Sequence, residues 1–332
     1  MKTKFTLFWL FTAMVAAVVP ALAENTGTVV MVDPALREIV PADAKIEKLA
    51  GGFKFTEGPV WVHAGYLLFS DIPNNRVDKW TPDGKVTVFR KPGVYRGFDH
   101  FEGPAAGSNG ETLDRQGRLT ICEQTPRRVT RLEKDGSLTL LAEKYEGKRF
   151  NSPNDLVYKS DGSLYFTDPP YGLPSQRFDD PHRELPFNGV FRLAGGIPQL
   201  LIKDLTFPNG LAFSPDEKYL YIAVSDPAKK IWMRYDVKAD GTVTNGQVFF
   251  DATSSTEDGG PDGMKVDQQG NVYGTGPGGI WIFSPAGKHL GTIKPPEVPA
   301  NCAWGDADGK TLYMTARTGL YRIRLKIAGV RP

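Results

Sequence analysis

Short apolar segments joined by glycine-containing turns recur along most of the chain. Leu113–Ile121 runs from an apolar residue through Asp-Arg-Gln-Gly into a second apolar segment, and Tyr158–Phe166 has the same layout around Ser-Asp-Gly. Asp and Gly readily adopt the turn conformations that a β-hairpin needs. The same hairpin recurs at Phe213–Tyr221, Val266–Tyr273 and Gly305–Tyr313. This pattern predicts a succession of short antiparallel strands.

A second hairpin follows the first in most copies. Examples lie at Trp80–Val86, Leu132–Leu138, Val237–Val243 and Phe283–His289. Two hairpins make four antiparallel strands, and a period of ~40 to 55 residues is typical of a propeller blade. No long amphipathic helix interrupts the repeat, so the period does not suit a Rossmann fold or a barrel surrounded by helices.

We therefore predict an all-β fold, a six-bladed β-propeller with four-stranded antiparallel blades, over residues 44–327. The last copy ends near Leu325 with three clear strands. The apolar positions of Ala44–Phe55 predict a strand that supplies the fourth and closes the ring by joining both ends of the chain. Residues 24–43 lack clear periodicity, and we expect them to form an exposed lead-in.

One polar residue precedes the first hairpin of every copy, and we call these six residues the anchors. They are Glu57, Asn109, Asn154, Asn209, Asp262 and Asn301. Each alone would pass for a turn residue, since Asn and Asp are common in turns. A turn needs no acid, however, and six such residues converge on the axis if the repeat closes into a ring. Converging oxygen donors are what a hard cation such as calcium requires.

The anchors predict a divalent metal site. Glu57 and Asp262 supply two carboxylates, and Asn154 and Asn209 supply amide oxygens, so water or substrate completes a shell of ~6 to 8 oxygens. The sequence has no Cys and His cluster with metal-ligand spacing, which disfavours zinc. A bound cation polarises a carbonyl and stabilises the oxyanion that forms when water attacks. Asp262 is the candidate to hold or deprotonate that water.

Several motifs resemble those of one known family. They are Thr-Glu-Gly-Pro-Val-Trp, Ser-Pro-Asn-Asp, Phe-Thr-Asp-Pro-Pro-Tyr-Gly, Pro-Asn-Gly-Leu-Ala-Phe-Ser-Pro-Asp-Glu and Gly-Pro-Asp-Gly-Met. From about Ala44 to Leu325 the chain looks like the gluconolactonase/regucalcin family, six-bladed propellers with a central divalent cation. The resemblance implies hydrolysis of a sugar-acid lactone to the open aldonic acid, but it does not specify which lactone.

The resemblance also implies residue roles. Glu57, Asn209 and Asp262 match the metal ligands of relatives, and Asp262 matches the proposed acid/base. Asn154 matches a residue that contacts substrate in some members and metal in others. The related diisopropylfluorophosphatase and paraoxonase propellers use four equivalent ligands, which implies Glu57, Asn154, Asn209 and Asp262 together.

Five further residues are candidates for the walls of the site. Asn109 and Arg149 are candidate substrate contacts, although Arg149 in Glu-Gly-Lys-Arg is equally typical of a solvated charge. His100 is a candidate base, although most single histidines are not catalytic. Asp168 and Tyr171 either line the mouth of the site or shape the Pro-Pro turn between them.

The first 23 residues predict a signal peptide. Lys2 and Lys4 precede an apolar run, Phe5–Val19, and an Ala-x-Ala cleavage site ends at Ala23. An uncleaved membrane anchor is the alternative, because the run is nearly the ~18 to 20 residues needed to span a bilayer. We expect cleavage, a periplasmic or secreted protein, and no integral membrane segment afterwards.

Charge and cysteine content narrow the partners. The formal net charge of +2 includes two N-terminal lysines, and the rest has no basic stripe, which argues against nucleic acid as a partner. We expect a monomer that acts on a small-molecule lactone. Cys122 and Cys302 lie in apolar, strand-like contexts, which favours buried free thiols over a disulfide.

Two other functions stay open at this point. The same site could hydrolyse phosphotriesters or aryl esters instead of lactones. Alternatively, a propeller with a metal site could be a non-catalytic binding module, which predicts metal binding without turnover.

Overall fold

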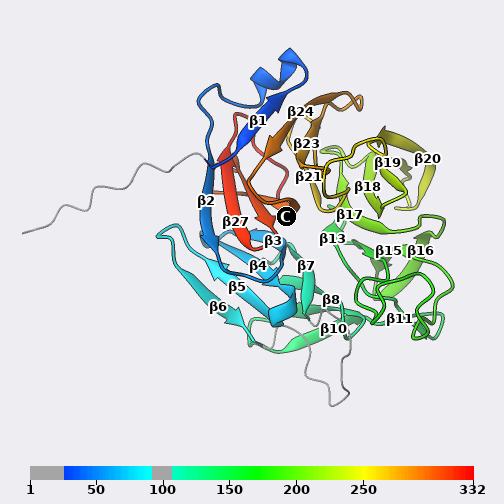
Figure 1. The fold of residues 1–332 in the computed structure, drawn as a ribbon. Helices are drawn as coiled ribbons and strands as arrows, with labels where there is room; N and C mark the ends of the chain where they lie inside the picture. Colours follow the sequence, from blue (N-terminus) through cyan, green and yellow to red (C-terminus); the bar gives the residue numbers. More distant parts are fainter. Residues whose placement is uncertain (1–25, 92–106) are drawn as a thin grey trace, which may run out of the picture.

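The computed structural model describes residues 26–91 and 107–332. Six antiparallel sheets, five of four strands and one of four strands extended by a fifth, stand around a common axis like the blades of a propeller (Figure 1). This confirms the predicted all-β, six-bladed β-propeller. The predicted signal peptide and His100 lie outside the described residues. No helix of the described part is long and apolar enough to cross a membrane.

The first three blades are meanders in chain order. The first blade has β3 (Thr56–Val62), β4 (Tyr66–Asp71), β5 (Arg76–Trp80) and β6 (Val86–Arg90). The second blade has β7 (Ser108–Leu113), β8 (Leu119–Glu123), β9 (Arg128–Leu132) and β10 (Leu138–Ala142). The third blade has β13 (Leu156–Tyr158), β14 (Leu164–Asp168), β15 (Gly189–Ala194) and β16 (Ile197–Ile202).

The last three blades complete the ring. The fourth blade has β17 (Pro208–Phe213), β18 (Tyr219–Asp226), β19 (Lys229–Val237) and β20 (Val243–Asp251). The fifth blade has β21 (Met264–Val266), β22 (Val272–Gly276), β23 (Gly279–Phe283) and β24 (His289–Lys294). The sixth blade has β25 (Pro299–Gly305), β26 (Thr311–Ala316), β27 (Gly319–Arg324) and β2 (Ile46–Gly51).

The sixth blade joins the two ends of the chain, as the sequence predicted. β2 pairs antiparallel with β27, and Ile46 lies opposite Ile323. The N-terminal strand is therefore the outer strand of a blade whose other three strands come from the C-terminal end. This arrangement leaves no gap in the ring, and it holds the six inner strands at a fixed distance from the axis.

The segment that we expected as an exposed lead-in is part of the fold. Residues Thr28–Met31 form β1, which pairs with β24 and extends the fifth blade to five strands. A short 3₁₀ helix, η1 (Pro34–Glu38), follows, and its Leu36 side chain is buried against the same blade. Four residues are too few to show an alternating pattern, and their partner strand lies far along the chain.

Three shorter elements lie in the connections between strands. A 3₁₀ helix, η2 (Ile72–Asn74), links β4 to β5, and its last residue precedes Asn75, which has a positive φ of 48°. A small hairpin of β11 (Lys144–Tyr145) and β12 (Lys148–Arg149) connects the second blade to the third.

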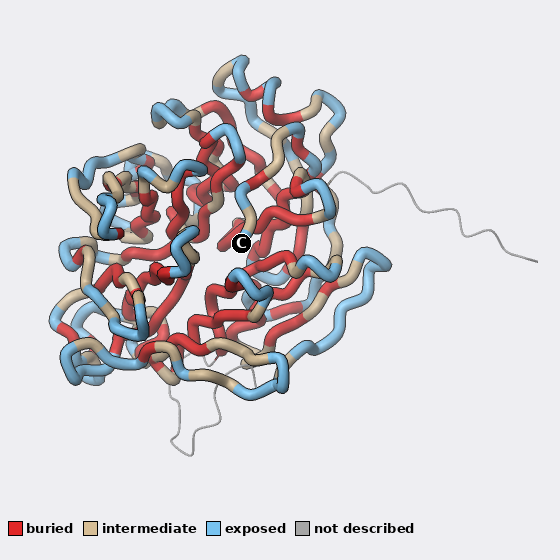
Figure 2. Tube along the Cα trace, turned by 180° about the vertical axis from the view of Figure 1, so that it is seen from behind, coloured by how far each residue is buried: buried red, intermediate tan, exposed pale blue. Residues whose placement is uncertain are grey.

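The core follows the inner strands. Every residue of β7, β17 and β25 is buried, whereas β6 at the outer edge is almost entirely exposed. Figure 2 shows this gradient from buried inner strands to exposed outer ones. Aromatic side chains fill the wedges between blades; for example, Trp61 stacks on Tyr313, with ring centroids 5.3 Å apart. This packing rigidly orients whatever side chains the inner strands present to the axis.

Candidate functional site

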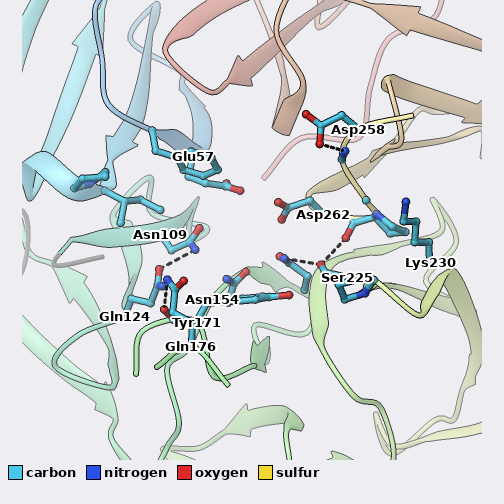
Figure 3. A pocket seen from close by; sticks show the side chains of 18 of the residues that line it. Glu57, Asn109, Gln124, Asn154, Tyr171, Gln176, Ser225, Lys230, Asp258 and Asp262 are labelled. Atoms are coloured by element: carbon cyan, nitrogen blue, oxygen red, sulfur yellow. Dashed lines mark hydrogen bonds between the residues drawn. The ribbon is translucent and has the colours of Figure 1, made fainter. Parts of the chain in front are cut away.

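A cavity of about 900 Å³ opens at the axis, where the inner strands begin. Five of the six anchors line it (Figure 3). These five are Glu57, Asn109, Asn154, Asn209 and Asp262. The structure therefore brings together residues that are spread over more than two hundred positions of the sequence.

Bulges in the inner strands aim the anchors at the axis. The register between the first and second strands of a blade shifts between Glu57 and Val60, between Ser108 and Glu111, and between Pro208 and Leu211. A bulge adds one residue to a strand and redirects its side chain. The anchor of each of these blades lies inside the shifted segment, so its side chain leaves the sheet and points into the cavity.

Glycine follows four of the anchors because the inner strands approach one another closely. A Cβ atom on Gly210 would lie 2.2 Å from the backbone oxygen of Asp262, and one on Gly263 would lie 2.0 Å from Cγ of Asn301. Both distances are shorter than any real carbon contact, so a larger residue would push the strands apart. The same crowding occurs after the first two anchors, at Gly58 and Gly110.

The carboxylate of Glu57 is buried and faces Asp262 across the axis (Figure 3). Its Oε2 accepts hydrogen bonds from the backbone N–H of Gly58 at 2.6 Å and from Nδ2 of Asn301 at 3.0 Å. Burial, and then the negative charge of Asp155, raise the pKa of Glu57 to about 7, although both hydrogen bonds oppose the rise. The positive charge of Lys265 also opposes the rise but does not offset the burial.

The ionised form of Asp262 is disfavoured even more strongly, although its side chain stays partly open to the cavity. Burial raises the pKa of Asp262 well above its usual range, and the negative charges of Glu57 and Asp155 raise it further. Three acids thus oppose one another around one point, which favours either a bound proton or a bound cation.

Asp155 is a site residue that the sequence analysis missed. It is buried, follows the anchor Asn154, and its Oδ2 accepts a hydrogen bond of 3.4 Å from Nδ2 of Asn301 across the ring. A signal for it was available, because four anchors are followed by glycine and this one is followed by an acid.

The sixth anchor, Asn301, has a different role from the other five. Its Nδ2 donates to Glu57 and Asp155, while its Oδ1 accepts from the backbone N–H of Cys302 at 2.8 Å. The amide thus presents hydrogens, not an oxygen, to the axis. Asn301 positions two of the acids and is unsuitable as a metal ligand in this orientation.

The amides of Asn109 and Asn209 are oriented by neighbours on the outer side of the site. Nδ2 of Asn209 donates to Ser225 Oγ at 2.9 Å, and Ser225 in turn donates to the backbone oxygen of Pro261. Nδ2 of Asn109 donates to Oε1 of Gln124 at 2.9 Å. The Asn109 amide thereby turns hydrogens toward Gln124, whereas the Asn209 amide donates both to Ser225 and to the carboxyl group of Asp262.

The donor chemistry fits a hard divalent cation. Carboxylate and amide oxygens are the ligands that calcium and magnesium prefer. Among residues 26–91 and 107–332, no ion pair joins Glu57, Asp155 or Asp262 to Lys or Arg, so their mutual repulsion is not relieved by a salt bridge. The described part contains no cluster of three His, Cys, Asp or Glu side chains at ligating distance, so the amides would be needed.

The walls of the cavity carry mixed polar groups. Tyr171 lines the cavity and stacks on Phe207, with ring centroids 5.7 Å apart, whereas Asp168 does not reach it. Asp168 accepts hydrogen bonds from the backbone N–H groups of Asn151 and Ser152, both at 2.7 Å, and burial raises its pKa to about 7. Of the two alternatives for this segment, Tyr171 shapes the mouth and Asp168 shapes the turn.

Two other sequence candidates lie away from the cavity or outside the described residues. Arg149 is exposed on β12, and its Nε lies 4.0 Å from Oε1 of Glu184, so the structure does not bring it to the site. The short β11–β12 hairpin projects into solvent, which explains this position. His100 is not among the described residues. Cys122 and Cys302 are buried free thiols, as predicted.

Three comparisons place the chain among known proteins. Residues 55–318 match the family model described as the SMP-30/Gluconolactonase/LRE-like region. A gluconolactonase of Zymomonas mobilis is 39% identical over 316 residues, covering 91% of this chain and 87% of the relative. The solved structure of a gluconolactonase from Xanthomonas campestris has a TM-score of 0.79 at 33% identity, covering 94% of this chain and 99% of that one.

A more distant likeness concerns the fold alone. The structure of a calcium-binding protein, regucalcin, from Agrobacterium tumefaciens has a TM-score of 0.68 at 19% identity. It covers 86% of this chain and 95% of the other.

Proposed function

The chain belongs to the SMP-30/gluconolactonase/LRE-like family and is a lactone hydrolase, and from this premise we propose that it opens a sugar-acid lactone with the help of a divalent cation held by the anchors. The observation that carries the proposal is the convergence of Glu57 and Asp262, with the amides of Asn154 and Asn209 beside them, on the cavity at the axis, with the negative charge of Asp155 close behind. The gluconolactonase relatives support a sugar-acid lactone as the substrate.

The residues proposed to hold the cation are Glu57, Asn154, Asn209 and Asp262. When bound, calcium or a similar ion would polarise the lactone carbonyl and stabilise the negative charge that develops on its oxygen. We favour calcium because all the candidate ligands are oxygens, and the structurally similar regucalcin is a calcium-binding protein. The acids repel one another without a cation, so binding relieves an unfavourable arrangement already built into the fold.

Asp262 is the proposed general base. Its carboxylate borders the cavity, where it can hydrogen-bond a water molecule beside the bound substrate. Asp262 orients a water molecule and takes its proton while the water oxygen bonds to the carbonyl carbon. The ring C–O bond then breaks, and the proton held by Asp262 passes to the ring oxygen, which becomes the free hydroxyl of the aldonic acid.

The polar walls suit a substrate with several hydroxyl groups. Asn109, Gln124, Tyr171 and Ser225 offer donors and acceptors around the cavity. The cationic side chain that lines it in the described part is Lys230, whose Nζ donates to the backbone oxygen of Ser255 at 3.3 Å. Neutral hydrogen-bonding groups therefore dominate the walls, as expected for a sugar lactone.

The test is proton release from δ-gluconolactone by the wild-type protein and by Asp262→Ala, with spontaneous hydrolysis subtracted. We expect turnover that a strong chelator removes and added calcium restores, and loss of turnover in the variant. Full activity of Asp262→Ala would contradict its role as the base. Metal binding without turnover of any lactone would support the binding module instead. Phosphotriesters and aryl esters belong in the same panel, but the gluconolactonase relatives do not favour them.

We also propose that residues 1–23 are removed on export and that the mature enzyme is a monomer in the periplasm or outside the cell. N-terminal sequencing of the protein recovered from each cell fraction tests the first statement. Light scattering of the purified protein tests the second.

A further inference from the structure

The hydrogen bond between Asn109 and Gln124 leaves one atom of the Asn109 amide without a partner in the described part of the chain. Asn109 Nδ2 donates to Gln124 Oε1 at 2.9 Å. Asn109 Oδ1, on the other half of the same amide, is buried and accepts no hydrogen bond from residues 26–91 or 107–332. The Asn109 side chain is only 5% exposed and lines the cavity, and it points toward the axis in Figure 3.

Gln124 is itself firmly held. It is 2% exposed, and a Cβ atom placed on Gly172 would lie 2.7 Å from both its Cγ and its backbone oxygen. Gly172 is fixed in turn, because its backbone N–H donates to Ser152 Oγ at 2.8 Å. The loop after β14 therefore presses on Gln124 and leaves its amide little freedom to turn away from Asn109.

Resting on the proposed function, we propose that Gln124 is a positioning residue that holds Asn109 as the acceptor for a ring hydroxyl of the lactone. A free asparagine amide can present either its oxygen or its hydrogens to the cavity. By accepting from Nδ2, Gln124 keeps the oxygen turned inward, where a buried acceptor requires a donor. A substrate hydroxyl supplies that donor. The enzyme therefore uses Asn109 to distinguish lactones that carry a hydroxyl group there from lactones that lack one.

The direction of the bond can be tested by chemistry. When two amides pair, either one can donate its N–H to the oxygen of the other, whereas a carboxylate can only accept a hydrogen bond. Gln124→Glu therefore enforces the orientation seen in the structure, whereas Gln124→Met keeps the length of the side chain and removes the acceptor. Gln116→Met is the matched control, since Gln116 is exposed at the far end of the β7–β8 hairpin. Gly172→Ala is a second route, because its methyl group displaces Gln124 without changing a polar atom.

The experiment compares δ-gluconolactone with δ-valerolactone, which has no hydroxyl groups, for each variant. We expect Gln124→Met to raise KM for gluconolactone about tenfold, since one hydrogen bond to the bound substrate is lost. Its kcat should change little, because the hydroxyl is bound alike in the ground state and the transition state. KM for valerolactone should stay constant, Gln124→Glu should resemble the wild type, and Gly172→Ala should follow Gln124→Met in the same direction.

Three results would overturn the inference. Equal losses for both lactones would mean that Gln124 serves only the fold, and melting temperatures would show it. A Gln124→Glu variant as impaired as Gln124→Met would mean that Asn109 presents its hydrogens instead. Unchanged KM values in Gln124→Met would show that Gln124 does not position Asn109 for substrate binding, and the proposed lactone hydrolysis would still stand. A wild-type protein that opens neither lactone would overturn the proposed function, and this inference with it.

Discussion

The two ends of the propeller axis are built from the same six inner strands, yet they differ in almost every property. At the start of the strands lies the cavity of about 900 Å³ with its acids and amides. At the other end lies a second cavity of about 120 Å³, lined largely by apolar residues such as Leu156, Leu211 and Trp304. The last residues of the chain, Val330 to Pro332, border this rear cavity (Figure 1).

The rear end is closed by the C-terminal tail. The backbone N–H of Val330 donates to the oxygen of Val266 at 2.9 Å, and Trp304 Nε1 donates to the same oxygen at 3.0 Å. A Cβ atom on Gly329 would lie 1.8 Å from Cγ of Trp304, so only glycine fits there. The tail and the indole thus bind the same backbone oxygen of β21, and together they cover the rear end of the axis.

The comparison shows that a buried acid is not by itself a catalytic group. Glu111 borders the rear cavity, and burial raises its pKa to about 8, in the same direction as the shifts of Glu57 and Asp262. Glu111 accepts a hydrogen bond from Ser70 Oγ at 2.9 Å. The two ends differ in the groups that surround the buried acid. At the front, several acids and amides meet in a cavity that can admit a substrate.

The largest expected effect comes from exchanging one acid at each end. Asp262→Asn should lower kcat/KM for gluconolactone by ~10³-fold, because the proposed general base is lost while the fold is kept. Glu111→Gln should stay within about twofold of the wild type, since an amide closely resembles the protonated acid. Initial rates and thermal melts of both variants check this. Similar losses at both ends would refute the distinction between them.

The next effect is a pH dependence of stability in the metal-free protein. The pKa of Glu57 is about 7 in the fold, against an ordinary value of 4.5, so the folded state holds a proton that the unfolded state releases. The stability associated with this group is full below its ordinary pKa and is lost as pH rises through 7. We expect the free energy of unfolding in chelator to fall by roughly 3 kcal/mol from pH 5 to pH 8.

Denaturant titrations at several pH values measure this fall. Saturating calcium should abolish it at pH 8, because the cation compensates the ionised acids. Glu57→Gln should flatten the curve, and a wild-type curve that is already flat would contradict the electrostatic account.

A third effect tests the rear closure. Gly329→Ala should cost about 2 kcal/mol of unfolding free energy, because its methyl group overlaps the indole of Trp304. Activity of the folded variant should be nearly unchanged, since the front and rear cavities have no lining residue in common. Denaturant melts and initial rates measure the two quantities. A parallel loss of activity would mean that the two ends are coupled.

The smallest effect concerns the acid behind the anchors. Asp155→Asn removes a charge that raises the pKa of both Glu57 and Asp262, so both acids should ionise at lower pH. At pH 8, calcium should bind about tenfold more weakly because the site has lost one negative charge. Calorimetric titration measures this affinity. An unchanged affinity would place Asp155 outside the influence of the ion.

Much of this architecture was predictable because its signals are local. The hairpins, their spacing and the closing strand at Ala44–Phe55 follow from turn residues and apolar positions within short windows. The anchors were found because they recur at one place in each repeat. Asp155 could have been found from the same pattern, because it stands where four other anchors are followed by glycine. The short β1 strand was missed because four residues carry too little periodicity.

The sequence by itself determined the number of blades and the chemical character of the axis, since these follow from a local pattern that repeats along the chain, and the strand left over at the N-terminal end indicated how the ring closes. The tertiary structure alone decided which anchors face the cavity, that Asn301 turns its hydrogens inward, that Arg149 stays in solvent and that Gln124 orients Asn109. Asn301 and Asp155 are 146 positions apart, yet their side chains meet. Such contacts depend on how blades pack around the axis, and no local pattern specifies the direction of a side chain across it.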